Sequence, residues 1–131
     1  MNFFMAMNPP TVTAQMKRVT VSKNGKPIFY EDQNLADARE KLTANLAQHK
    51  PKEKMEGPVR LITKWCFPTI KGKSNGQYKD TRPDTDNLQK LLKDCMTTVG
   101  FWKDDAQVTC EIIEKFWADI PGIYIEVEEI E

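Results

Sequence analysis

The chain has 131 residues and a formal net charge of +0, and its 40% hydrophobic and 29% charged residues are ordinary for a globular protein in water. This length predicts one domain over residues 1–131, which buries roughly two-thirds of the surface that the unfolded chain exposes. No apolar run approaches the ~20 residues of a membrane helix, and the start lacks the basic lead of a signal peptide, so we expect a cytoplasmic protein. Three cysteines without C-x-x-C spacing argue against a zinc site and suit reduced thiols.

The N-terminal third predicts a strand, a hairpin and a helix. Residues 2–7 form a short apolar run, typical of a buried strand, that two prolines then end. The apolar runs at 19–21 and 27–30 flank the Asn-Gly pair at 24–25, which is a strong signal for a tight hairpin turn. From 32 to 49 apolar residues recur at helical spacing, so we expect a helix that lies on the sheet.

The middle of the chain predicts a strand and then a basic loop. Residues 58–67 alternate between apolar side chains and more polar ones such as Arg60 and Lys64, which is typical of a half-buried strand. The next segment, 69–82, contains two glycines, a serine, an asparagine and three lysines. A mobile basic loop of this kind is suited to contacts with a nucleic-acid backbone.

A second helix is expected after Pro83, whose fixed φ suits a helix entrance. Gly100 then ends this helix. Between them the apolar residues fall on one helical face, which must be buried. These residues are Leu88, Leu91, Leu92, Cys95, Met96 and Val99.

Two strands complete the chain. Val108, Cys110 and Ile112 are expected to form the apolar face of the first. After a turn at 119–122, apolar and polar residues alternate over 123–128 and predict the last strand. Elements in this order imply a two-layer α+β domain with both helices on one face of a sheet.

Four carboxylates flank the second helix, Asp84 and Asp86 before it and Asp104 and Asp105 after it. If the helix folds back on the following strand these acids gather, and such a cluster repels itself unless a cation holds it. Lys90 lies one turn after Asp86, so its ammonium can reach the mouth of the cluster. Asp105 is in phase with the polar set of the following strand, so it is preferred over Asp104 as the third metal ligand.

Each acidic pair alone has a simpler explanation. Acids near a helix start commonly cap it and favour the positive end of its dipole, and adjacent aspartates are common in polar turns. The metal-site hypothesis therefore depends on the combination of D-x-D-N, a lysine one turn later, and V-G-F-W-K-D-D-A-Q-V.

That combination resembles the RusA family of Holliday-junction resolvases, which are small phage and prophage endonucleases. The residues that carry the resemblance are R-P-D-T-D-N-L-Q-K at 82–90, G-F-W-K-D-D-A-Q-V at 100–108, and Lys115. A Pro-Pro turn followed by basic residues is also similar to the start of the family pattern.

The resemblance implies roles for particular residues. Asp84, Asp86 and Asp105 would be the essential metal-binding acids, and Lys90 would be the essential lysine. The resemblance further implies a mixed β-sheet with two main helices packed on it, and a homodimer. Two symmetric cuts in one junction also argue for two copies, because one chain has one acidic cluster.

The net charge of zero hides a strongly polar molecule. Residues 50–82 carry nine bases against three acids, whereas residues 104–131 carry nine acids against one base. Lysines attract phosphates and carboxylates hold a cation, so this arrangement suits a metal-dependent nuclease, although the C-terminal glutamates are interpreted as a solvated face.

Lys115 lies about 33 Å of extended strand beyond Asp105, too far to share its metal. The residues expected to contact DNA are Lys71, Lys73, Lys79, Arg82, Lys115, Lys17 and Arg18.

The function expected from these features is a Mg²⁺-dependent endodeoxyribonuclease, with Mn²⁺ as a substitute, that resolves four-way junctions in DNA recombination and repair. Carboxylates suit Mg²⁺, a hard ion that prefers oxygen ligands. One alternative is a catalytically silent junction-binding protein, for which the acids would be a liability. Another is a metal-dependent nucleotide hydrolase or D-x-D transferase, against which the absence of a Gly-rich phosphate loop counts.

Overall fold

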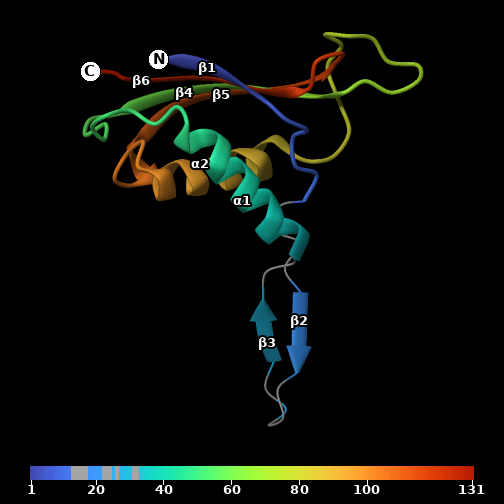
Figure 1. Cartoon of the computed structure of the whole chain (residues 1–131), viewed down its shortest axis with the longest axis horizontal. Coiled ribbons are helices and arrows are strands. Elements are labelled where there is room, and N and C mark those ends of the chain that lie inside the picture. Colours follow the sequence, from blue (N-terminus) through green and yellow to red (C-terminus); the bar gives the residue numbers. More distant parts are fainter. Residues whose placement is uncertain (13–17, 22–24, 26, 31–32) are drawn as a thin grey trace.

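The protein consists of a four-stranded sheet with two helices against one of its faces (Figure 1). The structure is a computed structural model that describes residues 1–12, 18–21, 25, 27–30 and 33–131, with the backbone alone described for 18–21 and 27–30. The helices are α1 (Gln33–Ala47) and α2 (Thr85–Val99). The strands of the main sheet are β1 (Asn2–Ala6), β4 (Val59–Pro68), β5 (Val108–Ala118) and β6 (Gly122–Glu129).

The sheet is mixed, in the order β1-β6-β4-β5. Strand β4 pairs antiparallel with β6 and parallel with β5, and β1 pairs antiparallel with β6. The expected α+β architecture, with a mixed sheet and two helices on one face, is thereby confirmed. A separate two-stranded sheet is formed by β2 (Arg18–Val21) and β3 (Pro27–Tyr30), the strands of the expected hairpin; Asn24 of its turn lies outside the described residues.

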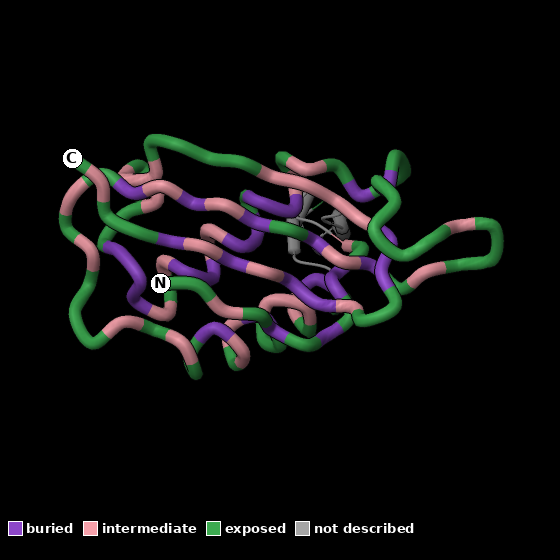
Figure 2. Tube along the Cα trace, turned by 90° about the horizontal axis from the view of Figure 1, so that it is seen from above, coloured by how far each residue is buried: buried purple, intermediate pink, exposed green. Residues whose placement is uncertain are grey.

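The core lies between the sheet and the helices. Every second residue of β4 is buried, and Figure 2 shows this alternation along the two middle strands of the sheet, β4 and β6. Burying each large apolar side chain contributes about 1.5–3 kcal/mol, so this alternation fixes which face of the sheet the helices cover. The inward residues of β4 are Val59, Leu61, Thr63, Trp65 and Phe67, which face Leu35, Leu42 and Leu46 of α1 and the apolar stripe of α2.

Helix α2 ends where its sequence predicts and begins at Thr85, so Asp86, which was expected before the helix, lies in its first turn. Gly100 ends it in the left-handed conformation, with φ of 105°, and its N–H donates to the Met96 carbonyl at 3.0 Å. A buried polar contact also ties α2 to the sheet, because the Thr63 hydroxyl donates to the Gln89 side chain at 2.9 Å. The Arg82–Pro83 peptide bond before the helix is cis.

The strand after α2 differs from its prediction in two ways. Asp105–Gln107 form a short 3-10 helix, η1, so the strand begins at Val108. Cys110 and Ile112 do not face the core, and Ile112 is 49% exposed.

A register shift explains the second difference. Val59 pairs with Val108 but the next residue, Arg60, pairs with Cys110, so Thr109 is an extra residue in β5. One extra residue reverses which side chains face the core. The side chains of β5 that pair with inward residues of β4 are therefore Glu111, Ile113, Lys115 and Trp117.

No helix within the described residues is both long and apolar enough to cross a membrane.

Candidate functional site

The first two aspartates lie at the N-terminus of α2. Asp84 is the N-cap residue, with extended backbone (φ −74°, ψ 147°), and its side chain makes no capping hydrogen bond. Asp86 is in the first helical turn, and its Oδ1 accepts a hydrogen bond from the N–H of Asn87 at 2.9 Å. Both side chains are exposed. The carboxylate of Asp84 is therefore not used to start the helix.

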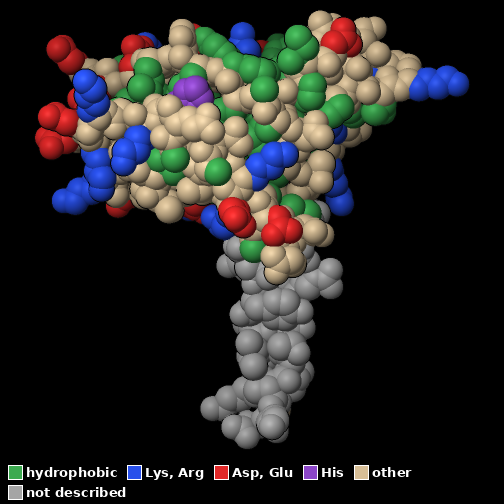
Figure 3. Space-filling view, viewed as in Figure 1, with side chains coloured by type: hydrophobic (Ala, Val, Ile, Leu, Met, Phe, Trp, Pro, Cys, Tyr) green, Lys and Arg blue, Asp and Glu red, His purple; other side chains and the backbone are tan. Residues whose placement is uncertain are grey.

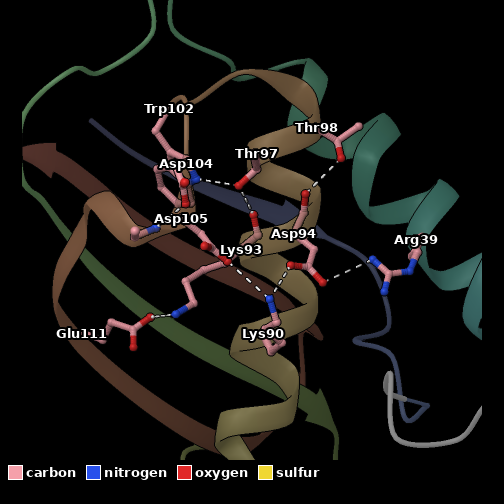
Figure 4. Close-up of polar contacts among 11 residues, drawn as sticks. Arg39, Lys90, Lys93, Asp94, Thr97, Thr98, Trp102, Asp104, Asp105 and Glu111 are labelled. Atoms are coloured by element: carbon pink, nitrogen blue, oxygen red, sulfur yellow. Dashed lines mark hydrogen bonds and ion pairs between the residues drawn. The ribbon is translucent and has the colours of Figure 1, made fainter.

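The adjacent aspartates after α2 have different surroundings. Asp104 is the N-cap of η1, and its Oδ1 accepts from the N–H of Ala106 at 2.9 Å. The Asp105 carboxylate turns toward α2, where its Oδ2 lies 3.4 Å from the Nζ of Lys90. Asp104 thus holds the turn together while Asp105 faces the helix (Figure 4).

Lys90 lies between two carboxylates. Its Nζ is 2.9 Å from Oδ1 of Asp94, one turn further along α2, and 3.4 Å from Oδ2 of Asp105. The hydrogen bond and charge of Asp94 raise the pKa of Lys90, and the carboxylate of Asp105 adds to this. The Nη1 atom of Arg39, on α1, lies 3.7 Å from Oδ2 of Asp94. Asp94 was not among the predicted site residues; its i,i+4 spacing from Lys90 is the signal for it.

A second ionic contact fastens α2 over β5. The Nζ of Lys93 lies 2.9 Å from Oε1 of Glu111, and the two side chains are 19% and 30% exposed. Together with the Lys90–Asp105 contact, it sets the polar side of α2 against η1 and the start of β5 (Figure 4). The pocket at this place is lined by Lys90, Asp94, Thr97, Thr98, Lys103, Asp104 and Asp105.

Gln107 organises the turn that carries Asp105. Its Oε1 accepts from the N–H groups of Lys103 and Asp104 at 2.9 and 3.1 Å. Its Nε2 donates to the carbonyl oxygens of Met55 and Gly57 at 2.8 and 3.2 Å. The first two contacts close the turn, and the last two join η1 to the segment before β4. This glutamine belongs to the D-D-A-Q-V motif, but no role was predicted for it from the sequence.

The two acidic groups are not gathered into one cluster. Among the residues that the structure describes, no three His, Cys, Asp or Glu side chains lie close enough to hold a metal ion. Lys90, which contacts Asp105, is four residues after Asp86, or about 6 Å along the helix axis. The donors are nevertheless all carboxylate oxygens, and this donor chemistry fits a hard divalent cation.

The residues expected to contact DNA fall into three groups. Lys71 and Arg82 are exposed in the segment between β4 and α2, and Lys73 is half-buried there; Figure 3 shows basic side chains at the outer end of the loop. Lys79 and Lys115 instead turn inward and donate to protein oxygens. Lys17 lies outside the described residues, and of Arg18 the backbone alone is described.

Comparisons with known proteins identify the family of the chain. Residues 9–128 match the family model described as Endodeoxyribonuclease RusA. The chain is 32% identical over 120 residues to the crossover junction endodeoxyribonuclease rusA of Lactococcus phage r1t, which covers 90% of each chain. It is 30% identical over 95 residues to the uncharacterized protein YqaN of Bacillus subtilis strain 168, which covers 64% of this chain and 66% of that protein. The matched range includes α2 and both pairs of aspartates, and the chain belongs to the RusA family of endodeoxyribonucleases.

Proposed function

We propose that the protein is a divalent-metal-dependent endonuclease that resolves four-way DNA junctions by hydrolysing phosphodiester bonds in two opposed strands. The observation that carries the proposal is the contact of the Asp105 carboxylate with Lys90, which follows Asp86 by one turn of α2. The Asp104 carboxylate instead caps η1. Membership in the RusA family supports nuclease chemistry, and the phage relative named a crossover junction endodeoxyribonuclease supports the four-way substrate. Such an enzyme acts in DNA recombination and repair.

Asp84, Asp86 and Asp105 are the residues that would hold the metal ion, which we expect to be Mg²⁺ or Mn²⁺. Asp104 is less favoured, because its Oδ1 already accepts the N–H of Ala106. A bound ion of this kind acidifies a water molecule and neutralises charge on the phosphoryl oxygens.

Lys90 is the residue we place against the charge that develops during cleavage. Lysine is already protonated at neutral pH, and the carboxylates of Asp94 and Asp105 raise the pKa of Lys90 further. The contact with Asp94 holds the ammonium at the polar side of α2, beside Asp105. A fixed positive charge at such a position stabilises the transition state more than the substrate, because negative charge builds up as the bond to the leaving oxygen breaks.

The exposed and half-buried bases of the segment between β4 and α2 are the proposed contacts to the DNA backbone. Lys71, Lys73 and Arg82 lie on the chain that leads directly to Asp84. Phosphate contacts on this segment would place the scissile bond near the acids without reading base sequence. Lys17 and Arg18 are proposed as further contacts on the basis of the family pattern.

The test uses three substrates, a four-way junction, a linear duplex and a nucleotide, each with and without Mg²⁺. Of the three substrates, we expect only the four-way junction to be cleaved, and only with Mg²⁺ or Mn²⁺. Ca²⁺ should support binding at most, because it activates water poorly. Binding without cleavage in every metal would indicate a silent junction-binding protein. Hydrolysis of the nucleotide would indicate the other alternative, and full cleavage in excess EDTA would contradict the metal requirement.

A further inference from the structure

Three consecutive carbonyl groups that lead into α2 accept hydrogen bonds from two lysines. The Nζ of Lys115 lies 2.7 Å from the carbonyl oxygens of both Thr81 and Pro83. The Nζ of Lys79 donates to the carbonyl oxygen of Arg82, between them, and to the hydroxyl of Thr81. The segment 81–83 belongs to no helix or strand. The two ammonium groups therefore satisfy carbonyls that regular structure leaves without a partner.

Lys79 is enclosed by aromatic rings. Lys79 is only 8% exposed, and its Nζ lies 5.2 Å from the ring centre of Phe67 and 4.6 Å from that of Trp117. Aromatic faces attract a cation, and this attraction offsets part of the cost of removing the ammonium from water. Burial lowers the pKa of Lys79, and the charge of Lys115 lowers it further. An ammonium enclosed in this way is not presented to a phosphate on the surface.

The two lysines are also joined through the backbone. The N–H of Lys79 donates to the carbonyl oxygen of Lys115 at 3.0 Å, and the N–H of Trp117 donates to that of Gln77 at 2.8 Å. The segment 77–79 therefore runs along the edge of β5. Both lysines are anchored to the sheet, in contrast to Lys71, which lies in the exposed part of the same loop.

We propose that Lys79 and Lys115 are positioning residues that fix the segment 81–83 and so set the place of the Asp84 carboxylate. Asp84 follows this segment directly and begins α2 without a side-chain cap, so its orientation depends on the backbone before it. The inference rests on the proposed function, since it takes Asp84 as a metal ligand. It replaces the sequence-based expectation that these two lysines contact DNA.

The test compares Lys79→Met and Lys115→Met with Lys71→Met. Methionine keeps an unbranched chain of similar length but cannot donate a hydrogen bond. Three quantities are measured for each variant: Mn²⁺ affinity by calorimetry without DNA, junction affinity as a function of salt concentration, and melting temperature. The Mn²⁺ titrations are made well below the lowest melting temperature, so that every variant is folded.

We expect Lys79→Met and Lys115→Met to bind Mn²⁺ about tenfold to a hundredfold more weakly, as is usual when a residue that positions a metal ligand is removed. Their junction affinity and its salt dependence should stay at the wild-type values. Lys71→Met should do the reverse, because each lost phosphate contact reduces the slope of log K against log salt by about 0.9 while metal affinity is kept.

Three results would overturn the inference. If Lys79→Met and Lys115→Met reduce the salt slope as Lys71→Met does and keep Mn²⁺ affinity, the lysines contact phosphates. If they lower the melting temperature alone, their role is packing. Lys115 is half-buried, so Lys115→Met keeps the test decisive if Lys79→Met fails to fold. Failure of the wild-type protein itself to bind Mn²⁺ and to cut junctions would remove the proposed function, and the inference with it.

Discussion

Asp104 and Asp105 are neighbours in sequence with the same chemistry, and their hydrogen bonds separate them. The Asp104 carboxylate accepts a backbone N–H at the start of η1, and Gln107 completes a reciprocal capping box there. The Asp105 carboxylate has a lysine side chain as its partner. The Asp104 carboxylate is held by the backbone of its own turn, whereas the Asp105 carboxylate can exchange its lysine partner for a metal ion.

Asparagine substitutions test this division. Asp84→Asn, Asp86→Asn and Asp105→Asn should each lower cleavage by orders of magnitude, because each removes a ligand charge but keeps the shape of the side chain. Junction binding should hold or tighten, since repulsion of the phosphates is reduced. Asp104→Asn should be mild, because the amide oxygen can still accept from Ala106. Single-turnover cleavage and gel-shift titration measure both effects, and an essential Asp104 beside a dispensable Asp105 would refute the assignment.

Lys90 tests whether the site is more than a set of metal ligands. A lysine that only pairs with Asp94 on the helix surface would contribute at most about 0.5 kcal/mol, and cleavage would barely change without it. A lysine placed on the phosphoryl group should contribute roughly 2.7–4 kcal/mol to the transition state, or about a hundred- to a thousandfold in rate. We predict the larger effect for Lys90→Ala, measured as cleavage rate under saturating junction and Mg²⁺, with junction binding weakened less than tenfold.

Lys93→Ala is the control for Lys90→Ala. It removes an ammonium from the same helix and breaks a comparable ion pair, at 2.9 Å from Glu111. Its cleavage rate should stay near wild type, with a loss of stability of less than about 1 kcal/mol. A Lys90→Ala protein that cuts as fast as this control would rule out the role of Lys90 in the reaction.

At the scale of elements, Gln107 holds η1 in place with more hydrogen bonds than the Asp104 side chain supplies. Gln107 makes four hydrogen bonds, two that close its turn and two that join the turn to the chain before β4. At a net value of about 0.5–1.5 kcal/mol each, partly recovered by water, we expect Gln107→Ala to lower the free energy of unfolding by about 2 kcal/mol. Urea denaturation measures this as a lower midpoint at unchanged slope.

The same substitution should slow cleavage, because η1 presents Asp105 to α2. Gln77→Ala is a matched control, since Gln77 accepts one exposed side-chain contact, from the N–H of Ser74 at 3.1 Å. Its stability should change by no more than about 0.5 kcal/mol. Equal losses of stability in the two variants would show that the four contacts of Gln107 carry no special weight.

Local periodicity predicted the elements and failed on the strand after α2. The alternation of β4 and the apolar stripe of α2 were visible in sequence, because burial on one face imposes a fixed period. The faces of β5 could not be found in this way, because the extra residue Thr109 is defined only by its pairing with β4. The preference for Asp105 was therefore argued from a strand that begins three residues later, at Val108.

The candidate site shows the same limit. Motif spacing predicted the four site residues Asp84, Asp86, Asp105 and Lys90, because residue type and order can be read from the sequence itself. The inward turn of Lys79 depends on aromatic rings contributed by β4 and β5, and that of Lys115 depends on the carbonyl oxygens of Thr81 and Pro83. The charge of the loop grouped Lys79 with Lys71, and the resemblance drew attention to Lys115, whereas the contacts of the folded chain set both lysines apart from the exposed ones.

The fold brings part of the basic stretch 50–82 against part of the acidic stretch 104–131 and leaves other bases exposed. The exposed bases of the β4–α2 segment include Lys71 and Arg82, whereas the glutamates of β6 contact other protein groups, such as Arg60 with Glu128. An electrostatic contact with DNA that is limited to this segment should weaken steadily with salt. The slope of that dependence counts the phosphates contacted and is the reference value for the Lys71→Met measurement.

Resolution of a junction requires two cuts in opposed strands, and within the described residues the chain presents one set of Asp84, Asp86, Asp105 and Lys90. Two copies related by a two-fold axis would present two such sets. We therefore predict that light scattering at micromolar concentration gives twice the chain mass of 15.1 kDa. A monomer that still makes paired cuts would overturn the prediction.

Mixed dimers extend this test from mass to mechanism. If each copy cuts one strand, a dimer of wild-type and Asp105→Asn chains should nick the junction once and leave it unresolved, because the substituted copy lacks one ligand charge. Junctions in a supercoiled plasmid distinguish the outcomes, since a single nick relaxes the circle and two coordinated cuts linearise it. Differently tagged chains, purified through both tags, isolate the mixed species. Linear product from this species at the wild-type rate would mean that one copy makes both cuts, and the two-site account of the dimer would then be wrong.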